Sequence, residues 1–196
     1  RCEIRVRGPN IMPGYLNDPE KTAEAFDEEG FFCTGDAVRF VDEDDLTKGM
    51  RFDGRISEDF KLLTGTWVRA ATLRLELLID YAPLVQDIVI CGADRAEVGL
   101  MIFPSTEALA LAGEAEIDGA LMSEALRSAL ADKLALRADH GSAARIMRVM
   151  VLAEPPSMGD GEITAKGNLN TRKVLARRAD LLERLYAEDD PAVVRL

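Results

Sequence analysis

The spacing of hydrophobic and polar positions divides the chain into two parts near residue 57. In the first part, short apolar runs separated by polar turns predict strands at residues 3–7, 31–33, 37–41 and 51–53. A short helix is predicted at residues 19–26, with Asn17 or Asp18 as its first capping residue. Residues 1–56 are therefore expected to be β-rich and too short to close a hydrophobic core of their own.

From residue 57 onward the apolar runs lengthen and helical spacing appears. Thr64-Gly65 lies between β-forming residues and predicts a tight hairpin turn. Longer apolar runs predict strands at residues 85–91, 98–103 and 146–152, the first two central in the sheet. Apolar residues at helical spacing predict helices at residues 72–81, 121–136 and 171–186, the first capped by Thr72. We expect an α+β fold, a small and mostly antiparallel sheet with helices at residues 57–196, preceded by the β-rich segment.

Composition and charge narrow the class of protein. The chain has 196 residues, 47% of them hydrophobic, and a formal net charge of −11, which disfavours a nucleic-acid-binding surface. No apolar stretch is long enough for a membrane span. Cys2, Cys33 and Cys91 are odd in number and widely spaced, so we expect reduced core thiols in a cytoplasmic protein. The cysteines and the single His140 show no metal-ligand spacing, and no metal site is expected.

A carboxylate and a guanidinium are placed so that they can hold a ribose. Thr34-Gly35-Asp36 precedes Gly54-Arg55 by a short polar stretch, and we expect the two motifs on adjacent loops. Asp36 can accept hydrogen bonds from both ribose hydroxyls, and Arg55 can donate from a fork that stays charged. Each such bond contributes about 1.5–3 kcal/mol. The alternative interpretation is a Gly-Asp turn and a surface arginine.

Thr34-Gly35-Asp36 ends a series of four segments that follow one another at residues 3–8, 12–15, 19–22 and 30–36. The series resembles the end of the large domain of adenylate-forming enzymes, which include acyl-CoA synthetases, peptide-synthetase adenylation domains and luciferases. The loop at residues 161–168 resembles the segment that carries their catalytic lysine, and the resemblance covers nearly the whole chain. Residues 53–68 are most similar to the feruloyl-CoA synthetase branch, which acts on aromatic acids.

The resemblance implies an activity and a domain organisation. The parent enzyme would join a carboxylic acid to CoA through an acyl-adenylate, using ATP and Mg²⁺ and releasing AMP and pyrophosphate. Residues 1–56 would form the incomplete C-terminal end of the large adenylation domain, and residues 57–196 the mobile lid domain. Ser57 would be the hinge about which the lid rotates between the two half-reactions.

The resemblance also implies roles for individual residues. Lys166 would be the catalytic lysine, since negative charge accumulates when the acid attacks the α-phosphate of ATP. Most of the family has Thr-x-x-Gly-Lys here, and counting from Thr164 puts Asn168 at the lysine position, so that register stays open, with Lys173 as a further alternative. Lys61 would meet the nucleotide or a CoA phosphate.

The segment from Gly65 to Trp67 would line the pantetheine tunnel, although Trp67 could equally be a core residue. The chain is expected to be an inactive C-terminal fragment, because the phosphate loop of the family lies upstream of the matching region. The alternatives are a non-catalytic α+β interaction module and a nucleotide-binding module that uses only Asp36 and Arg55.

Unpaired strand edges in residues 1–56, with Phe26, Phe31 and Phe40 exposed, would favour a homodimer through this segment.

Overall fold

A computed structural model describes the whole chain, from Arg1 to Leu196, and it divides into two compact units. The first unit is Arg1–Asp59 and the second is Phe60–Leu196. The sequence placed the boundary after residue 56, three residues before the end of the first unit. The hinge at Ser57 stays a prediction.

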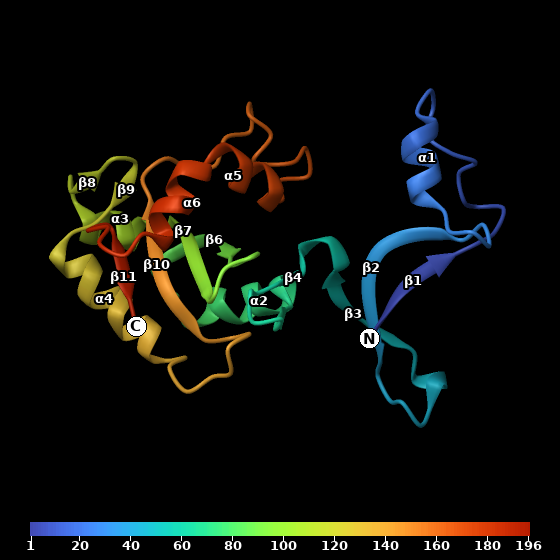
Figure 1. Ribbon diagram of the computed structural model, residues 1–196, viewed down its shortest axis with the longest axis horizontal. Helices are drawn as coiled ribbons and strands as arrows, with labels where there is room; N and C mark the ends of the chain where they lie inside the picture. Colours follow the sequence, from blue (N-terminus) through green and yellow to red (C-terminus); the bar gives the residue numbers. More distant parts are fainter. The chain divides into compact units, whose positions relative to one another are not determined.

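The first unit is a three-stranded antiparallel sheet in the order β1–β2–β3, with one short helix beside it (Figure 1). Its elements are β1 (Cys2–Val6), α1 (Pro19–Ala25), β2 (Phe32–Phe40), η1 (Leu46–Lys48), β3 (Met50–Arg55) and η2 (Ile56–Glu58). The Asp18 carboxylate begins α1 by accepting a hydrogen bond from the Lys21 N–H at 3.0 Å. Ala37 and Val38 are the buried apolar residues of this unit, so its core is as small as the sequence predicted.

Thr34-Gly35-Asp36 does not form the turn that the sequence predicted, because it lies inside the long strand β2. Gly35 has a φ of +71°, and the strand register shifts on both sides of the motif, between Glu3 and Arg5 and between Asp36 and Val38. Strands β1 and β3 pair with β2 from either side, so the backbone continues as a strand with an irregularity that glycine accommodates.

The second unit is built on a six-stranded mixed sheet in the order β6–β7–β10–β9–β8, with β11 paired to β10. Its strands are β6 (Val85–Cys91), β7 (Val98–Pro104), β8 (Glu116–Ile117), β9 (Ala120–Leu121), β10 (Ile146–Leu152) and β11 (Val193–Arg195). The sequence predicted β6, β7 and β10, but β6 lies at an edge and not in the centre. All pairs are antiparallel except β7 with β10, which is parallel.

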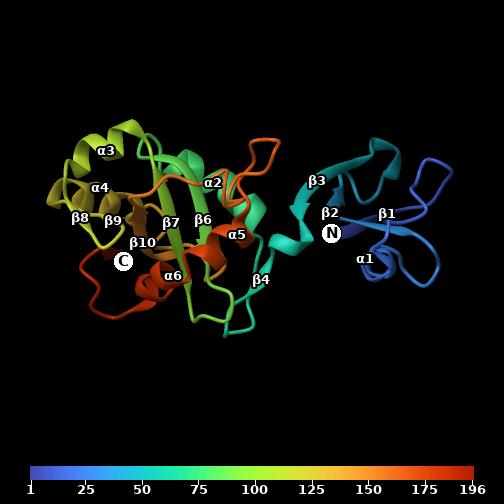
Figure 2. The ribbon, with the colours of Figure 1, turned by 90° about the horizontal axis from the view of Figure 1, so that it is seen from above.

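Helices cover this sheet on both faces, with α3 and α4 on one side and α6 on the other (Figure 2). The helices are α2 (Ala70–Asp80), α3 (Thr106–Ala112), α4 (Glu124–Ala135), α5 (Thr171–Arg177) and α6 (Ala179–Tyr186). Fully buried side chains such as Leu77, Phe103, Leu130 and Leu185 join helices and sheet into one hydrophobic core. The expected α+β fold with small antiparallel sheets and helices is confirmed.

Three helix predictions need correction. Helix α2 begins at Ala70, so Thr72 lies inside it and is not the cap, since the two alanines before Thr72 are strong helix formers. Helix α4 begins at Glu124, where the Ser123 hydroxyl accepts from the Leu126 N–H at 3.1 Å, because the residues before it pair as β9. The helix predicted at residues 171–186 is two helices, interrupted at Arg178.

The predicted hairpin is present as β4 (Phe60–Lys61) and β5 (Trp67–Val68), with Gly65 at a φ of +82° in its turn. Helix length and apolarity nowhere reach what a membrane crossing requires. All three cysteines are free thiols, but only Cys91 is buried, so Cys2 and Cys33 are not core residues as the sequence suggested.

Candidate active site

Asp36 and Arg55 lie directly opposite each other on strands β2 and β3, and not on loops as expected. The Arg55 Nε is 3.2 Å from the Asp36 Oδ1. This oxygen is buried and accepts no hydrogen bond within the protein. The Thr34 hydroxyl donates to the Ile4 carbonyl at 2.7 Å and accepts from the Asp36 N–H at 3.1 Å, which fixes the backbone beside the carboxylate. The arrangement can offer an acceptor and a cationic donor to two neighbouring hydroxyls.

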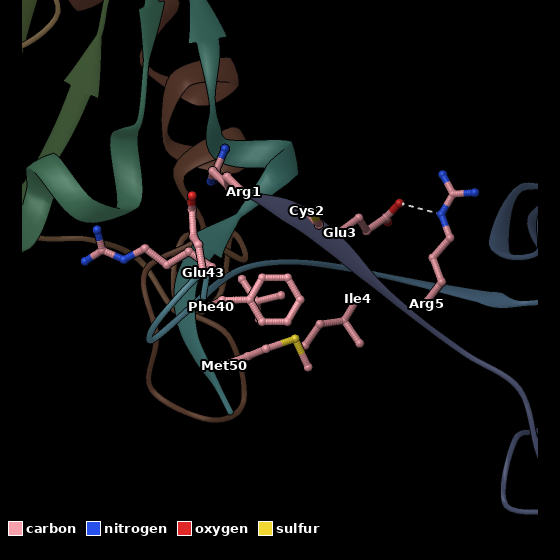
Figure 3. A pocket seen from close by; sticks show the side chains of 10 residues that line it. Arg1, Cys2, Glu3, Ile4, Arg5, Phe40, Glu43 and Met50 are labelled. Carbon is pink, nitrogen blue, oxygen red and sulfur yellow. Dashed lines mark hydrogen bonds and ion pairs between the residues drawn. The ribbon is translucent and has the colours of Figure 1, made fainter. Parts of the chain in front are cut away.

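A separate hollow in the same unit is bordered by β1, the end of β2 and the start of β3 (Figure 3). Ile4, Phe40 and Met50 are among its apolar side chains, and Arg1 and Glu43 are among its charged ones. Neither Asp36 nor Arg55 lines it. The hollow is therefore distinct from the candidate ribose clamp.

Of the three phenylalanines of the first unit that were expected to be exposed, two are half-buried. Phe26 packs edge-on against Phe32 with ring centroids 5.6 Å apart, and the Arg7 guanidinium lies 4.6 Å from the Phe31 ring centroid. Both rings are half-buried because these neighbours cover them. Phe40, 39% exposed, is the one member of the predicted trio that is exposed.

Lys61, Gly65 and Trp67 come together on the β4–β5 hairpin. Lys61 and Trp67 are cross-strand partners, and the Lys61 Nζ lies 5.3 Å from the Trp67 ring centroid. Trp67 is 60% exposed, so the alternative of a core role is wrong. The hairpin is held to the turn between β6 and β7 by a hydrogen bond from the Leu63 N–H to the Arg95 carbonyl at 2.8 Å. An exposed aromatic ring with an adjacent cation thus projects from a fixed support. Ser57 is exposed within η2.

Lys166 lies in a tight turn between Ile163 and Leu169, which form an isolated β-bridge. The Thr164 N–H donates to the Asn168 carbonyl and the Gly167 N–H to the Thr164 carbonyl, both at 2.8 Å. The Lys166 side chain is exposed and forms no ion pair, so its ammonium group is free to meet an external anion.

The other two register alternatives lie elsewhere in this region. Asn168 is the residue that closes the turn, since its N–H donates to the Thr164 hydroxyl at 3.2 Å. Lys173 lies in the first turn of α5. The structure does not bring Lys173 into the turn with Lys166, and their roles stay predictions.

Sequence reasoning missed a buried ion pair at the base of the Lys166 turn. Glu162 is 0% exposed and Arg178 is 3% exposed. The Arg178 Nε and Nη2 donate to the two Glu162 carboxylate oxygens at 2.8 and 2.9 Å. The Arg178 guanidinium lowers the pKa of Glu162 to about 2, from an ordinary value of 4.5. The carboxylate is therefore charged throughout the neutral range.

A signal for this pair was present in the spacing of the last helical segment. Val174, Leu181 and Leu185 are buried, and position 178 lies on the same stripe, four residues after Val174. A charged residue on a core-facing stripe requires a buried partner. The identity of that partner could not be read from the sequence, because Glu162 lies in a loop without periodicity.

No three His, Cys, Asp or Glu side chains gather closely enough to hold a metal ion.

Comparison with known proteins identifies the family. A family model described as the AMP-binding enzyme C-terminal domain matches residues 61–190. The carboxylic acid reductase of Segniliparus rugosus is 32% identical over 192 residues, which cover 96% of this chain and 15% of that protein. The 4-coumarate–CoA ligase of Pinus taeda is 37% identical over 97 residues, which cover 50% of this chain and 17% of that protein.

Among solved structures, the A-PCP didomain of the Segniliparus rugosus carboxylic acid reductase in complex with AMP matches with a TM-score of 0.74 and 31% identity. The match covers 94% of this chain and 24% of that chain. The protein thus spans a small part of the length of each of these relatives. On the strength of the family match, which covers most of the second unit, this chain belongs to the AMP-binding enzyme C-terminal domain family of adenylate-forming enzymes.

Proposed function

We propose that this chain forms the C-terminal part of an ATP-dependent acid–thiol ligase. The enzyme would activate a carboxylic acid as its acyl-adenylate, release pyrophosphate, and then transfer the acyl group to the thiol of CoA with release of AMP. The chain alone would be inactive, since it has no glycine-rich phosphate loop. Ser57, at the end of the first unit, would act as the hinge between the two half-reactions.

The observation that carries the proposal is the cross-strand pair of Asp36 and Arg55. The Asp36 Oδ1 forms an ion pair with the Arg55 Nε, 3.2 Å away, but accepts no hydrogen bond inside the protein, and a ribose hydroxyl would supply one. The Arg55 side chain is 60% exposed and would donate to the same diol. Both side chains come from paired strands, so their separation is set by the sheet and needs little reorganisation on binding.

Lys166 would stabilise the negative charge that develops as the acid attacks the α-phosphate. Its exposed position in a turn closed by backbone hydrogen bonds suits this role, because the cation is presented by a short and ordered support. On the β4–β5 hairpin, Lys61 would meet a CoA phosphate, and the exposed ring of Trp67, together with Gly65, would border the pantetheine arm.

We further propose an aromatic acid as substrate, on the similarity of residues 53–68 to feruloyl-CoA synthetases and the relationship to a 4-coumarate–CoA ligase. A second candidate acceptor is a thiol carried on a protein domain. The similarity to a carboxylic acid reductase over 192 residues, and to the structure of its A-PCP didomain, favours this candidate.

The test uses the enzyme that contains this chain. ATP–pyrophosphate exchange is measured with ferulate, 4-coumarate and a fatty acid, and thioester formation with CoA and with a phosphopantetheine-bearing carrier domain. Lys166→Ala should slow adenylate formation on the order of 10²–10³-fold and leave transfer from a supplied acyl-adenylate to CoA nearly unchanged. Lys173→Ala is the matched control, a second exposed lysine of the same region.

Equal slowing of both half-reactions by Lys166→Ala would mean that the lysine has another role. A larger effect of Lys173→Ala would move the catalytic assignment to α5. Absence of acid-dependent pyrophosphate exchange with every acid would refute the ligase proposal itself.

A further inference from the structure

The loop that carries Lys166 is tied to the folded domain at its base, through the buried Glu162 and through Leu169, which packs against the hydrophobic core. Lys166 lies four residues after Glu162 and four residues before Asn170, the capping residue of α5. The Asn170 N–H donates to the Glu162 carbonyl at 2.7 Å, so the two ends of this segment meet. The loop lies beside α5 in Figure 1. Whatever holds Glu162 therefore holds the base of the Lys166 turn.

We infer that the buried Glu162–Arg178 ion pair is a positioning device for Lys166 in the adenylation half-reaction. Glu162 and Arg178 would not touch the substrate, and they would act by holding the turn in one orientation. This inference rests on the proposed function of Lys166, and it adds two residues to which neither the sequence motifs nor the family match assign a role.

Glu162 is held by its side chain and its backbone together. Its carboxylate accepts from the Ser157 N–H at 2.8 Å in addition to the two bonds from Arg178, and its own N–H donates to the Ser157 carbonyl at 2.9 Å. Three donors around one carboxylate leave it few alternative orientations. Glu162 thus fixes the preceding loop through Ser157 and the following loop through Asn170.

Arg178 connects this carboxylate to the sheet. Its guanidinium lies 5.0 Å from the ring centroid of Phe103, a fully buried residue of β7. It also donates to the backbone carbonyls of Glu154 at 2.8 Å and Pro155 at 2.9 Å, just after β10. The break between α5 and α6 falls at Arg178, which has the non-helical dihedrals φ −106° and ψ 35°. One side chain therefore joins the loop, a helix junction and strand β7 of the sheet.

The neighbouring Arg177 forms a second clamp on the outside of the same loop. Its guanidinium makes two hydrogen bonds of 3.0 Å to the Glu154 carboxylate and lies 3.3 Å from the Asp160 carboxylate. Its Nη1 is also 3.6 Å from a Glu162 oxygen. The two arginines hold the loop from its buried side and its exposed side.

A catalytic cation on a flexible stem needs such a support. Loss of about an ångström in the position of a reacting or stabilising group reduces the rate strongly, because the transition state requires a defined geometry. A purely apolar anchor could slide, whereas bidentate Arg–carboxylate hydrogen bonding fixes both distance and plane. The geometry therefore favours a positioning role over simple filling of the core.

A second buried arginine provides the matched control. Arg137 is 5% exposed and donates to Asp80 at 2.5 Å and to Glu76 at 3.0 Å. It joins the turn just after α4 to α2, and none of its hydrogen bonds goes to the Lys166 loop. Arg137→Lys thus removes one buried guanidinium fork, as Arg178→Lys does, without touching that loop.

The first experiment measures amide hydrogen exchange on the 196-residue chain itself. Glu162→Gln and Arg178→Lys should accelerate exchange of the Thr164, Gly167 and Asn170 amides at least tenfold, while the amides of β7 keep their protection. Arg137→Lys should leave those three amides unchanged. Unchanged protection of the loop in Glu162→Gln and Arg178→Lys would overturn the inference, whatever the activity of the enzyme.

The second experiment measures kinetics of the enzyme that contains the chain. Glu162→Gln and Arg178→Lys should lower kcat for ATP–pyrophosphate exchange on the order of tenfold or more, with little change in the KM for ATP and in thioester formation from a supplied acyl-adenylate. Arg137→Lys should leave all three unchanged. Such a split is not expected from a general loss of stability, which lowers all activities together.

The two proposals fail separately. Full ATP–pyrophosphate exchange activity in Lys166→Ala would refute the catalytic role of Lys166. The support of the loop by Glu162 and Arg178 would then be decided by amide hydrogen exchange alone. Slow ATP–pyrophosphate exchange in Lys166→Ala, combined with full ATP–pyrophosphate exchange in Glu162→Gln and Arg178→Lys, would overturn the positioning inference. It would leave the proposed function intact.

Discussion

Replacing Glu162 with glutamine should change how the stability of the second unit depends on pH. The Arg178 guanidinium lowers the pKa of Glu162 from 4.5 to about 2. At about 1.4 kcal/mol per pKa unit, this difference corresponds to about 3 kcal/mol of stability at pH 7. Because the pKa in the folded state is the lower one, the contribution is complete above about pH 4.5 and is lost as the pH falls toward about 2.

Urea unfolding followed by far-UV circular dichroism measures this contribution. The free energy of unfolding is determined for the natural chain and for Glu162→Gln at a series of pH values. Glutamine keeps the size of the side chain and cannot titrate, so the difference between the two chains isolates the Glu162 carboxylate from Glu154 and Asp190, whose pKa values are also lowered by paired arginines. We expect a difference of about 3 kcal/mol at neutral pH that shrinks to about 1.4 kcal/mol near pH 3.

A difference that stays constant between neutral pH and about pH 3 would refute the reasoning. It would mean that Glu162 has the same pKa in the folded and unfolded chains, and hence that Arg178 does not hold it as the structure indicates. Arg137→Lys is again the control, since its pH profile should match that of the natural chain in shape.

Three further predictions concern the rest of the molecule. Asp36→Ala should weaken AMP binding to the parent enzyme about 10–100-fold, because one or two charge-assisted hydrogen bonds are lost; equal affinities in isothermal titration would contradict the ribose clamp. A chain that begins at Ser57 should be soluble and unfold cooperatively, because the second unit contains its own core; insolubility of this chain alone would show that the two units depend on each other. The exposed Phe40, Met50 and Phe52 of the first unit should support a homodimer, which light scattering at high concentration would reject if only monomers are seen.

The sequence predicted most elements of the second unit because their signals are local. The apolar runs at β6, β7 and β10 and the glycine turn of the β4–β5 hairpin need no distant partner to be recognised. The order of the strands in the sheet could not be predicted from these local signals. β10 pairs in parallel with β7 and also carries β11, and those contacts join residues far apart in the sequence.

The sequence named Asp36 and Arg55 as the candidate ribose clamp but placed them on loops, whereas the structure places them on strands β2 and β3. Gly35 indicates a turn when it is considered alone, since a positive φ is common in turns. The structure keeps the motif inside β2 because β1 and β3 supply hydrogen-bond partners on both sides. The direct opposition of Asp36 and Arg55 is a consequence of that register, which single-residue signals do not contain.

What the sequence by itself determined was the family resemblance and the α+β class, since these depend on residue type and local order, and the same signals predicted the candidate residues of the clamp and the loop. Only the tertiary structure decided that Trp67 is exposed, that one predicted helix is broken at Arg178, and that Glu162 is buried at the base of the loop that carries Lys166. Burial of a charged side chain depends on which partner the fold brings to it from another segment. That partner is set by the packing of the whole domain, because the free energy of a buried charge is determined by its surroundings and not by its neighbours in the sequence.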